Sequence, residues 1–254
     1  MQVNSRSFIA PNRWALALVL ALLFGLGLGI RLTDLTDLPL DFHPTRQLFS
    51  AIKARGIFYQ TAPDIPEWQR DIALRTYEAE ATIEPPVIDT LVAKSYQVFG
   101  EHLWIARIYS SVFWMIGGIF FFLLARELLS LDEALLSLTV YLLLPYGVIA
   151  SRSFQPDPLM VMSIVIGWWG AVRWSKQPAW KWVLVAGFAG GFAIFIKLTA
   201  IFFIAGGYIG AVLSRYSFKD ALRMTQVWTM AVLTLLPGAA YTIYGLFIAE
   251  YLGS

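Results

Sequence analysis

The stretch WKWVLVAGFAGGFAIFIKLTAIFFIAGGYIGAVL, from Trp180 to Leu213, decides the class of this protein. As one α-helix with a rise of 1.5 Å per residue it would extend for roughly 50 Å, well beyond a hydrocarbon core of about 30 Å. Lys197 is the only charged residue in its interior, and a lysine costs little at the membrane interface but a few kcal/mol at the bilayer centre. The stretch therefore predicts two membrane spans that turn near Lys197.

Other apolar runs of membrane-spanning length lie near 14–30, 104–124, 133–150, 158–174 and 226–247. Of the 254 residues, 58% are hydrophobic, and the mean hydropathy of +0.63 exceeds what a soluble core needs. The sequence thus predicts an all-α polytopic membrane protein, with residues 1–254 forming a single membrane domain of about seven transmembrane helices.

The first apolar run has two interpretations. It follows basic residues, as a cleaved signal peptide would, but the segment 25–31 lacks a clear small-x-small cleavage site. We therefore expect a retained helix. Its glycines, Gly25, Gly27 and Gly29, would let another helix approach closely.

Charge and cysteine content exclude several classes of protein. The net charge is only +2 and the basic residues are scattered, unlike the dense basic face of a nucleic-acid-binding protein. The chain contains no cysteine, which excludes disulfides, thiol catalysis and cysteine metal sites.

The distribution of Lys and Arg predicts the orientation of the spans. The short connections on one side hold only Arg152 and Lys197, and eight of the 19 basic residues lie in or beside the long first loop, to which the rule applies weakly. We therefore expect residues 1–13 in the cytoplasm, and the opposite face outside a plasma membrane. The connections on the cytoplasmic side hold nine basic residues: Arg6, Arg13, Arg126, Arg173, Lys176, Lys181, Arg215, Lys219 and Arg223.

The long first loop, residues 31–103, is polar but keeps helical signals. Pro44 fits the first position of an amphipathic helix that Gly56 would end, and such a helix would lie along the membrane interface. A second helix is expected over about 67–80 and a third from Pro85-Pro86 to Gly100. The sequence predicts a structured outer loop of juxtamembrane helices.

Two carboxylates fall on the predicted outer face. Asp41 lies just before the first loop helix, where free backbone amides and the helix dipole would favour its ionised form, and an ionised carboxylate can act as a general base. Asp157 precedes Pro158 at the start of the fourth span, where a helix N-cap is the first interpretation and a ligand-orienting role the second. Asp41 is therefore the candidate catalytic residue.

Arg107, Arg152 and Lys197 are basic residues at the outer ends of spans. Arg107 lies in the outer turns of the second span, where a buried guanidinium needs a partner, and Asp41, Glu84 and Asp157 are the candidates. Arg152 and Lys197 lie in short outer loops that usually avoid positive charge. Snorkelling is the ordinary explanation for such side chains, and binding of a lipid phosphate is the functional one.

A divalent metal is considered at Asp41, His43, His102 and Asp157. The two histidines lie far apart in the sequence and lack the spacing of metal ligands, so this site has little support. No cofactor is assigned.

The order of these features resembles the GT-C membrane glycosyltransferases, in the branch of the protein O-mannosyltransferases and aminoarabinose transferases (glycosyltransferase families 39 and 83). The resemblance covers nearly the whole chain and depends on the order of short motifs: Asp41, Pro85-Pro86, Ala106-Arg107, Arg152, Asp157 and Lys197. It implies a first block of seven spans followed by a variable portion with more spans. We expect this chain to correspond to the first block.

The chain departs from that family at two motifs. The family often has Asp-Glu where this chain has Asp41-Phe42, and a Lys-Pro-Pro or His-Pro-Pro element where this chain has Glu84-Pro85-Pro86. Any role of the adjacent Glu, or of the basic residue before Pro-Pro, is therefore not carried over.

The resemblance implies transfer of a sugar from a polyprenyl-phosphate donor to an acceptor hydroxyl on the extracytoplasmic side, with inversion at the anomeric carbon. Asp41 would be the base, and Arg107, Arg152 and Lys197 would stabilise the leaving lipid phosphate. Asp157 would orient the acceptor or bind a metal. The partners are then the lipid-linked sugar and membrane lipids, whereas the sugar and the acceptor stay open.

Two other functions remain open from the sequence. A small-molecule or lipid transporter would also carry charges among its spans, although such proteins commonly contain internal repeats and no repeat is visible here. The chain could also serve as a non-catalytic subunit that binds the lipid carrier.

Overall fold

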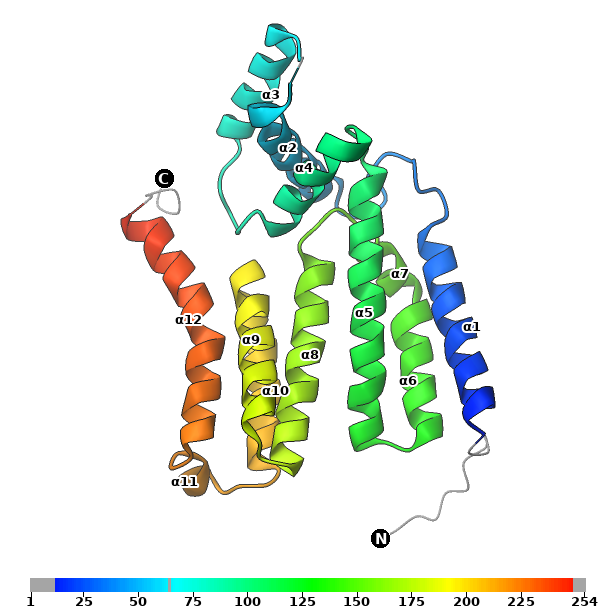
Figure 1. Cartoon of the computed structure of the whole chain (residues 1–254), viewed down its shortest axis with the longest axis vertical. Coiled ribbons are helices and arrows are strands. Elements are labelled where there is room, and N and C mark those ends of the chain that lie inside the picture. The colour runs from blue at the N-terminus through cyan, green and yellow to red at the C-terminus, as the bar shows by residue number, and fades with distance from the viewer. Residues whose placement is uncertain (1–11, 64, 249–254) are drawn as a thin grey trace.

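A computed structural model describes residues 12–63 and 65–248, so the expected cytoplasmic segment 1–13 lies almost wholly outside the described residues. Within the described ranges the ordered elements are all helices (Figure 1). They are α1 (Arg13–Arg31), α2 (Pro44–Thr61), α3 (Glu67–Ala79), α4 (Val87–Phe99), α5 (Trp104–Leu128), α6 (Leu131–Leu143), α7 (Pro145–Ser151), α8 (Asp157–Lys176), α9 (Trp180–Ile196), α10 (Ala200–Leu213), α11 (Phe218–Ala221) and α12 (Thr225–Phe247).

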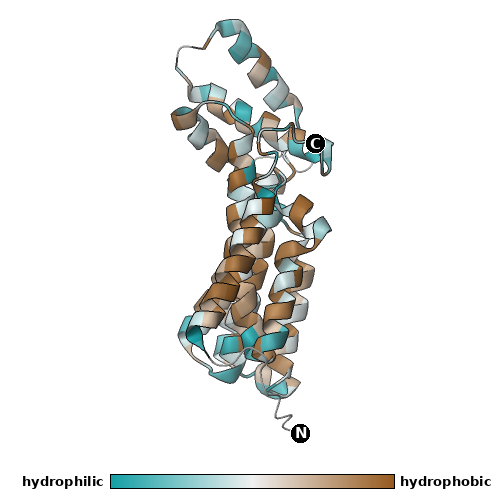
Figure 2. Ribbon diagram, turned by 90° about the vertical axis from the view of Figure 1, so that its right-hand side faces the viewer, coloured by the Kyte–Doolittle hydropathy of each residue, from teal (hydrophilic) through white to brown (hydrophobic). Residues whose placement is uncertain are grey.

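The helices α1 and α5 to α12 form a bundle whose middle is apolar and whose ends are more polar (Figures 1 and 2). Among the described helices, α1, α5 and α12 are each long and apolar enough to cross a membrane, and α6 with α7 makes a fourth candidate with a bend of 56°. This arrangement is that of a polytopic membrane protein.

Each of the seven expected spans coincides with a helix or a pair of helices, but not all of these helices are long and apolar enough to cross a membrane. Lys197 separates α9 from α10, as the sequence predicted, yet these two helices contain only 17 and 14 residues. The helix α8 carries three charged residues near its ends. A membrane span at α8, α9 and α10 therefore stays a prediction, although α8 packs against α5, α9 and α10 inside the bundle.

The run 133–150, expected as one span, is broken between α6 and α7. Pro145 has no backbone N–H, so the helical hydrogen bond to the Tyr141 carbonyl is lost. The Trp114 indole N–H donates to that carbonyl instead, at 3.2 Å. Arg31, at the end of α1 and fully buried, donates to the Leu142 carbonyl at 2.8 Å and to the Ser151 hydroxyl at 2.6 Å. These side chains stabilise the break.

Only one of the three glycines of α1 has the expected packing role. A Cβ on Gly27 would lie 3.4 Å from the Leu142 Cβ, whereas nothing lies within 4 Å of a Cβ on Gly25 or Gly29. The prediction was therefore wrong for Gly25 and Gly29, because no helix in the described part of the chain packs against their face of α1.

The outer loop is folded, as predicted, into three helices that lie over one end of the bundle (Figure 1). We call α2, α3 and α4 the lid. The third of them ends at Gly100, whose φ of +84° suits glycine and whose N–H donates to the Tyr96 carbonyl. A small apolar core that includes Ala54, Val92, Ile105 and Phe154 joins the lid to α5 and to the loop after α7.

Gly56 does not end the first lid helix, and that prediction was wrong. The helix α2 continues to Thr61, and Gly56 is buried where α2 meets the side chain of Tyr77 on α3. A Cβ at this position would collide with the Cβ and ring of Tyr77. The glycine therefore serves the contact between two helices and does not terminate one.

Candidate functional site

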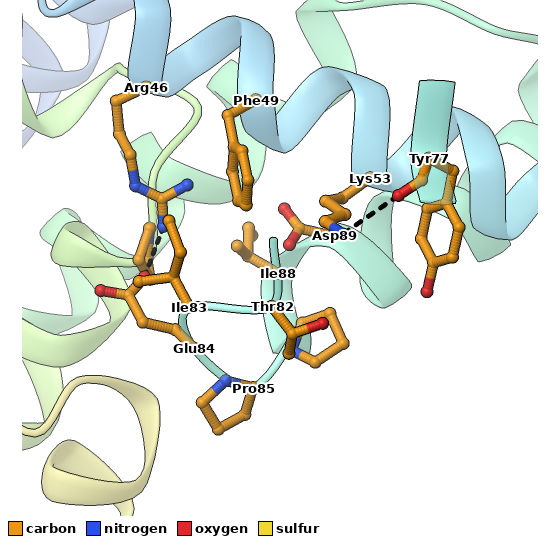
Figure 3. A pocket seen from close by; sticks show the side chains of 12 residues that line it. Arg46, Phe49, Lys53, Tyr77, Thr82, Ile83, Glu84, Pro85, Ile88 and Asp89 are labelled. Carbon is orange, nitrogen blue, oxygen red and sulfur yellow. Dashed lines mark hydrogen bonds and ion pairs between the residues drawn. The ribbon is translucent and has the colours of Figure 1, made fainter. Parts of the chain in front are cut away.

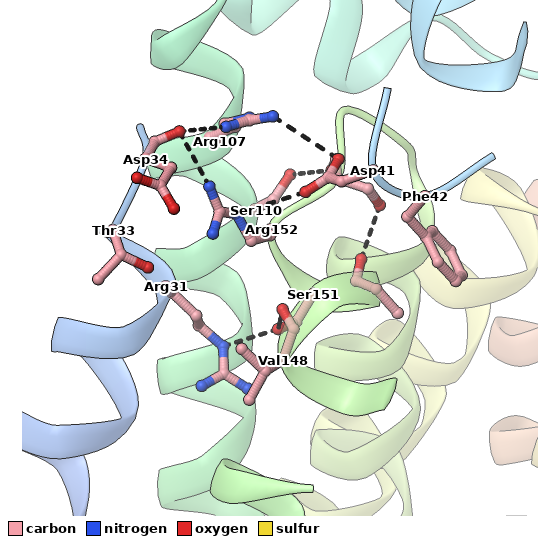
Figure 4. Close-up of polar contacts among 12 residues, drawn as sticks. Arg31, Thr33, Asp34, Asp41, Phe42, Arg107, Ser110, Val148, Ser151 and Arg152 are labelled. Atoms are coloured by element: carbon pink, nitrogen blue, oxygen red, sulfur yellow. Dashed lines mark hydrogen bonds and ion pairs between the residues drawn. The ribbon is translucent and has the colours of Figure 1, made fainter. Parts of the chain in front are cut away.

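Asp41 lies in the segment that connects α1 to the lid, between two arginines (Figure 4). Its Oδ1 is 3.6 Å from Nη2 of Arg107, and its Oδ2 is 3.8 Å from Nε of Arg152. The carboxylate side chain is 37% exposed, whereas both guanidinium groups are buried. Asp41 thus presents an accessible carboxylate with two fixed positive charges behind it.

The two arginines also hold the backbone that precedes Asp41. Arg107, in the first turn of α5, donates to the carbonyls of Asp34 at 2.6 Å and Leu38 at 3.1 Å. Arg152, which follows α7, donates to the same Asp34 carbonyl at 3.1 Å. The loop, α5 and α7 are therefore fixed relative to one another at this point (Figure 4).

The contacts of Asp41 differ from those expected. The N-cap residue of α2 is His43, two residues later, and no side chain caps this helix. The carboxylate instead lies among Arg107, Arg152 and the Gln47 amide, whose Nε2 is 3.3 Å from Oδ1. The carboxylate is therefore surrounded by the two guanidinium groups and the Gln47 amide, and not by the backbone amides of α2.

Gln47 is fully buried and connects the lid to the bundle. Its Nε2 donates to the Phe42 carbonyl at 2.6 Å, and its Oε1 accepts from the Phe154 backbone N–H at 2.9 Å. Since Phe42 follows Asp41, this side chain fixes the position of the carboxylate from the lid side.

A second polar cluster forms around Lys197, where α9 ends. The ammonium group lies 3.0 and 3.1 Å from the two oxygens of Asp157 and 3.9 Å from Glu84. Glu84 also pairs with Arg46 in the first turn of α2. The cluster therefore joins the lid to the start of α8 and the end of α9.

Asp157 is not a helix cap, so the first interpretation from the sequence was wrong. The N-cap position of α8 is Pro156, Asp157 is the first helical residue, and no side chain caps the helix. Because Lys197 lies within hydrogen-bond distance, the carboxylate binds that ammonium group.

A cavity of about 450 Å³ lies between the lid and the end of the bundle that the lid covers. We call it the outer cavity. Its lining residues include Lys197, Arg46, His43 and Asp157. Aromatic side chains of Phe42, Trp114 and Tyr146 complete one side. Such a cavity combines an apolar wall with a few polar groups, as ligand sites usually do.

The candidate residues fall into two groups rather than one. Asp41, Arg107 and Arg152 meet directly, and Lys197 meets Asp157. Asp41 does not line the outer cavity, but the next residue, Phe42, does. The partner expected for Arg107 is Asp41, and its guanidinium also donates to the carbonyls of Asp34 and Leu38.

The four metal candidates do not gather. Within residues 12–63 and 65–248, no three His, Asp or Glu side chains are arranged to hold a metal ion. His102 stacks on Trp104, at a ring distance of 5.8 Å, while His43 lines the outer cavity.

Sequence reasoning did not select Arg46, Glu84 or Gln47 as site residues. One signal was available for Arg46, because a basic residue in the first turn of a helix is opposed by the helix dipole and suggests another role. Gln47 gave no such signal, since its partners come from distant segments. Glu84 stands at the position of the family's Pro-Pro motif, but nothing local to it indicated its partners, Arg46 and Lys197.

The chain matches one family of known proteins. The family model described as dolichyl-phosphate-mannose-protein mannosyltransferase matches residues 83–242, which include Glu84, Arg107, Arg152, Asp157 and Lys197 but not Asp41. No curated protein and no solved structure matches the chain. Because the family model covers more than half of the 254 residues, the chain belongs to the dolichyl-phosphate-mannose-protein mannosyltransferase family.

Proposed function

We propose that the protein transfers a sugar from a polyprenyl-phosphate donor to an acceptor hydroxyl on the extracytoplasmic side of the plasma membrane, with inversion. Membership of the family supports a membrane glycosyltransferase that uses a polyprenyl-phosphate-linked sugar. The observation that carries the finer proposal is an accessible carboxylate, Asp41, held beside a cavity that Lys197 and Arg46 line at one end of an apolar bundle.

Asp41 is the proposed general base. Its ion pairs of 3.6 and 3.8 Å are longer than hydrogen bonds, so the oxygens keep lone pairs for an acceptor hydroxyl. The carboxylate takes the hydroxyl proton while the acceptor oxygen attacks the anomeric carbon and the bond from that carbon to the phosphate oxygen breaks. A single displacement inverts the anomeric centre.

The leaving group is a lipid phosphate, and the outer cavity supplies cations for it. Lys197 and Arg46 line the cavity, and a fixed cation stabilises the charge that develops as the bond breaks. We therefore propose these two for phosphate binding. Arg107 and Arg152 instead act on Asp41 as positioning residues, because their donors face Asp41 and the backbone before it.

Asp157 is proposed to orient Lys197. Both of its oxygens lie within hydrogen-bond distance of the ammonium group, which fixes the lysine side chain at the cavity wall. The orientation with residues 1–13 in the cytoplasm follows from the nine basic residues of that face and is part of the proposal.

The test is a transfer assay in membranes with labelled polyprenyl-phosphate sugars, comparing wild type with Asp41→Asn. Loss of a general base lowers the rate by about 10²–10⁴-fold, and we expect a loss in that range. Asp71→Asn, on the exposed face of α3, is the matched control and should transfer normally.

Two results would contradict this proposal. Full transfer by Asp41→Asn removes Asp41 as the base. If wild-type protein binds the lipid-linked sugar but consumes none, the chain is a carrier-binding subunit; if the donor instead moves between leaflets, it is a transporter.

A further inference from the structure

A second, smaller cleft lies within the lid, beside the outer cavity (Figure 3). It has a volume of about 70 Å³ and is bounded by α2, the end of α3 and the segment that leads into α4. We call it the lid cleft. Arg46 lines both the lid cleft and the outer cavity.

Asp89 is the unexplained group of the lid cleft. This residue of α4 is only 7% exposed, and its Oδ1 is buried without a hydrogen-bond partner. A buried carboxylate oxygen without a donor is costly, so native proteins usually satisfy it with a ligand or with water. Because Asp89 lines the cleft, a small rotation of its carboxyl group would bring this oxygen to an incoming O–H or N–H group.

The other charges of the cleft are matched within the protein. Lys53 donates to the carbonyls of Glu80 at 2.6 Å and Tyr77 at 3.2 Å, near the end of α3. Arg46 pairs with Glu84. Two basic and two acidic side chains therefore line the cleft, so neither sign of charge dominates and a neutral ligand is favoured over a highly charged one.

The remaining wall suits a sugar. Phe49 and Tyr77 provide aromatic rings, and Thr82 adds a hydroxyl (Figure 3). A site with a few polar groups among aromatic side chains can bind the hydroxyls and the C–H face of a ring together. At roughly 10–15 Å³ for each water site, 70 Å³ holds several waters and hence one hydroxylated edge of a ring.

The position of the lid cleft relates it to transfer. Glu84 lines the lid cleft, pairs with Arg46 and lies 3.9 Å from Lys197 of the outer cavity. Pro156 borders the lid cleft, and the next residue, Asp157, borders the outer cavity. A molecule in the lid cleft would therefore lie next to a lipid-linked donor.

We infer that the lid cleft is an acceptor subsite and that the acceptor is a carbohydrate, one of whose hydroxyls donates to Oδ1 of Asp89. This inference rests on the proposed glycosyl transfer, since it names the acceptor of that reaction. A carbohydrate acceptor differs from a polypeptide acceptor, which would present one serine or threonine hydroxyl and no hydroxylated ring.

Binding is tested with the full chain in nanodiscs and with methyl α-mannopyranoside and methyl β-glucopyranoside as probes, by saturation-transfer NMR. We expect at least one of them to bind wild type. Asp89→Leu should weaken binding at least tenfold and Asp89→Asn by a smaller factor, whereas Asp71→Asn should match wild type. If both glycosides fail to bind, or bind equally well to Asp89→Leu of unchanged helix content, the inference is overturned.

The same samples separate this inference from the proposed function. Asp41→Asn should keep glycoside binding while losing transfer, because Asp41 lines neither cleft. If wild type transfers sugar to a serine peptide and not to a glycoside, the carbohydrate acceptor is wrong and the proposed transferase stands. If glycosides bind but no donor is consumed, the proposed reaction fails while the sugar site remains.

Discussion

Arg107 illustrates how a single residue links the membrane bundle to the site. A guanidinium near the end of an apolar helix must be paired, because an unpaired charge there is costly. Its partners, Asp41 and the carbonyls of Asp34 and Leu38, all belong to the segment after α1. The same contacts that satisfy the buried charge of Arg107 also fix the carboxylate of Asp41, which is the proposed base.

Asp89 gives a prediction at the residue scale. Burial raises the pKa of its carboxyl from 3.8 to about 7, Glu84 adds to the rise, and Arg46, Lys53 and the Ser50 hydroxyl oppose it. The folded protein therefore holds a proton here that the unfolded chain releases above about pH 4. Between the two values the free energy of unfolding should fall with rising pH, by about 1.4 kcal/mol per unit and about 4 kcal/mol at most.

The measurement is the unfolding of ligand-free protein in detergent at pH values from 5 to 8, for wild type and Asp89→Asn. Asparagine does not titrate, so the difference in stability between the two proteins should shift in favour of the variant as pH rises to about 7 and then stay level. Parallel profiles for the two proteins would show that Asp89 titrates normally in the fold.

At the scale of elements, the contact between α2 and α3 depends on Gly56. Alanine normally stabilises a helix interior relative to glycine by roughly 0.5–1 kcal/mol. At Gly56 the added Cβ meets the Cβ and inner ring atoms of Tyr77, which cannot move without α3. We expect Gly56→Ala to lower the free energy of unfolding by about 1–3 kcal/mol.

Hydrogen exchange of α3 and thermal unfolding measure this effect, with faster exchange expected over residues 67–79. Gly25→Ala is the matched control, because a Cβ there meets nothing within 4 Å and stability should be unchanged or slightly higher. Equal effects of the two substitutions would indicate that the lid adapts to the added carbon.

Elements were predictable from the sequence where local chemistry decides them. Apolar runs, Pro44 at the start of α2 and Gly100 after α4 each have a local physical cause, and the helices follow them closely. The predicted helix end at Gly56 was wrong because glycine is needed there for the contact with Tyr77 of α3. The break at Pro145 was not predicted because the run around it is continuously apolar. The carbonyls that lose helical partners at the break accept hydrogen bonds from Arg31 of α1 and Trp114 of α5.

At the scale of the whole molecule, the sequence placed the candidate residues on one face but could not pair them. The sequence predicts Asp157 as an N-cap because Asp before Pro is typical of a helix start. Only the fold brings Lys197 next to Asp157. The lid cleft was invisible for the same reason, since α2, α3 and α4 each supply part of it. Order and topology therefore predicted the family, whereas the site required the packing of distant segments.

The number of crossings is the property of the whole molecule that decides where this site faces. The chain has no cysteine, so single cysteines can report the side of each connection. If α8, α9 and α10 each cross, Glu78 of α3 and Leu198, between α9 and α10, lie on the outer side. Gln177, between α8 and α9, and Lys219 of α11 then lie on the inner side. All four positions are exposed.

We therefore predict that a membrane-impermeant maleimide labels Glu78→Cys and Leu198→Cys in intact cells, and Gln177→Cys and Lys219→Cys only after permeabilisation. The reasons are that α9 and α10 run between the two ends of the bundle beside α8 and that basic residues favour the cytoplasmic side (Figure 1). Labelling of Leu198→Cys only after permeabilisation would mean that α9 and α10 do not reach the outer face. Lys197 would then lie away from the donor's phosphate, and the proposed anion site would lose its main cation.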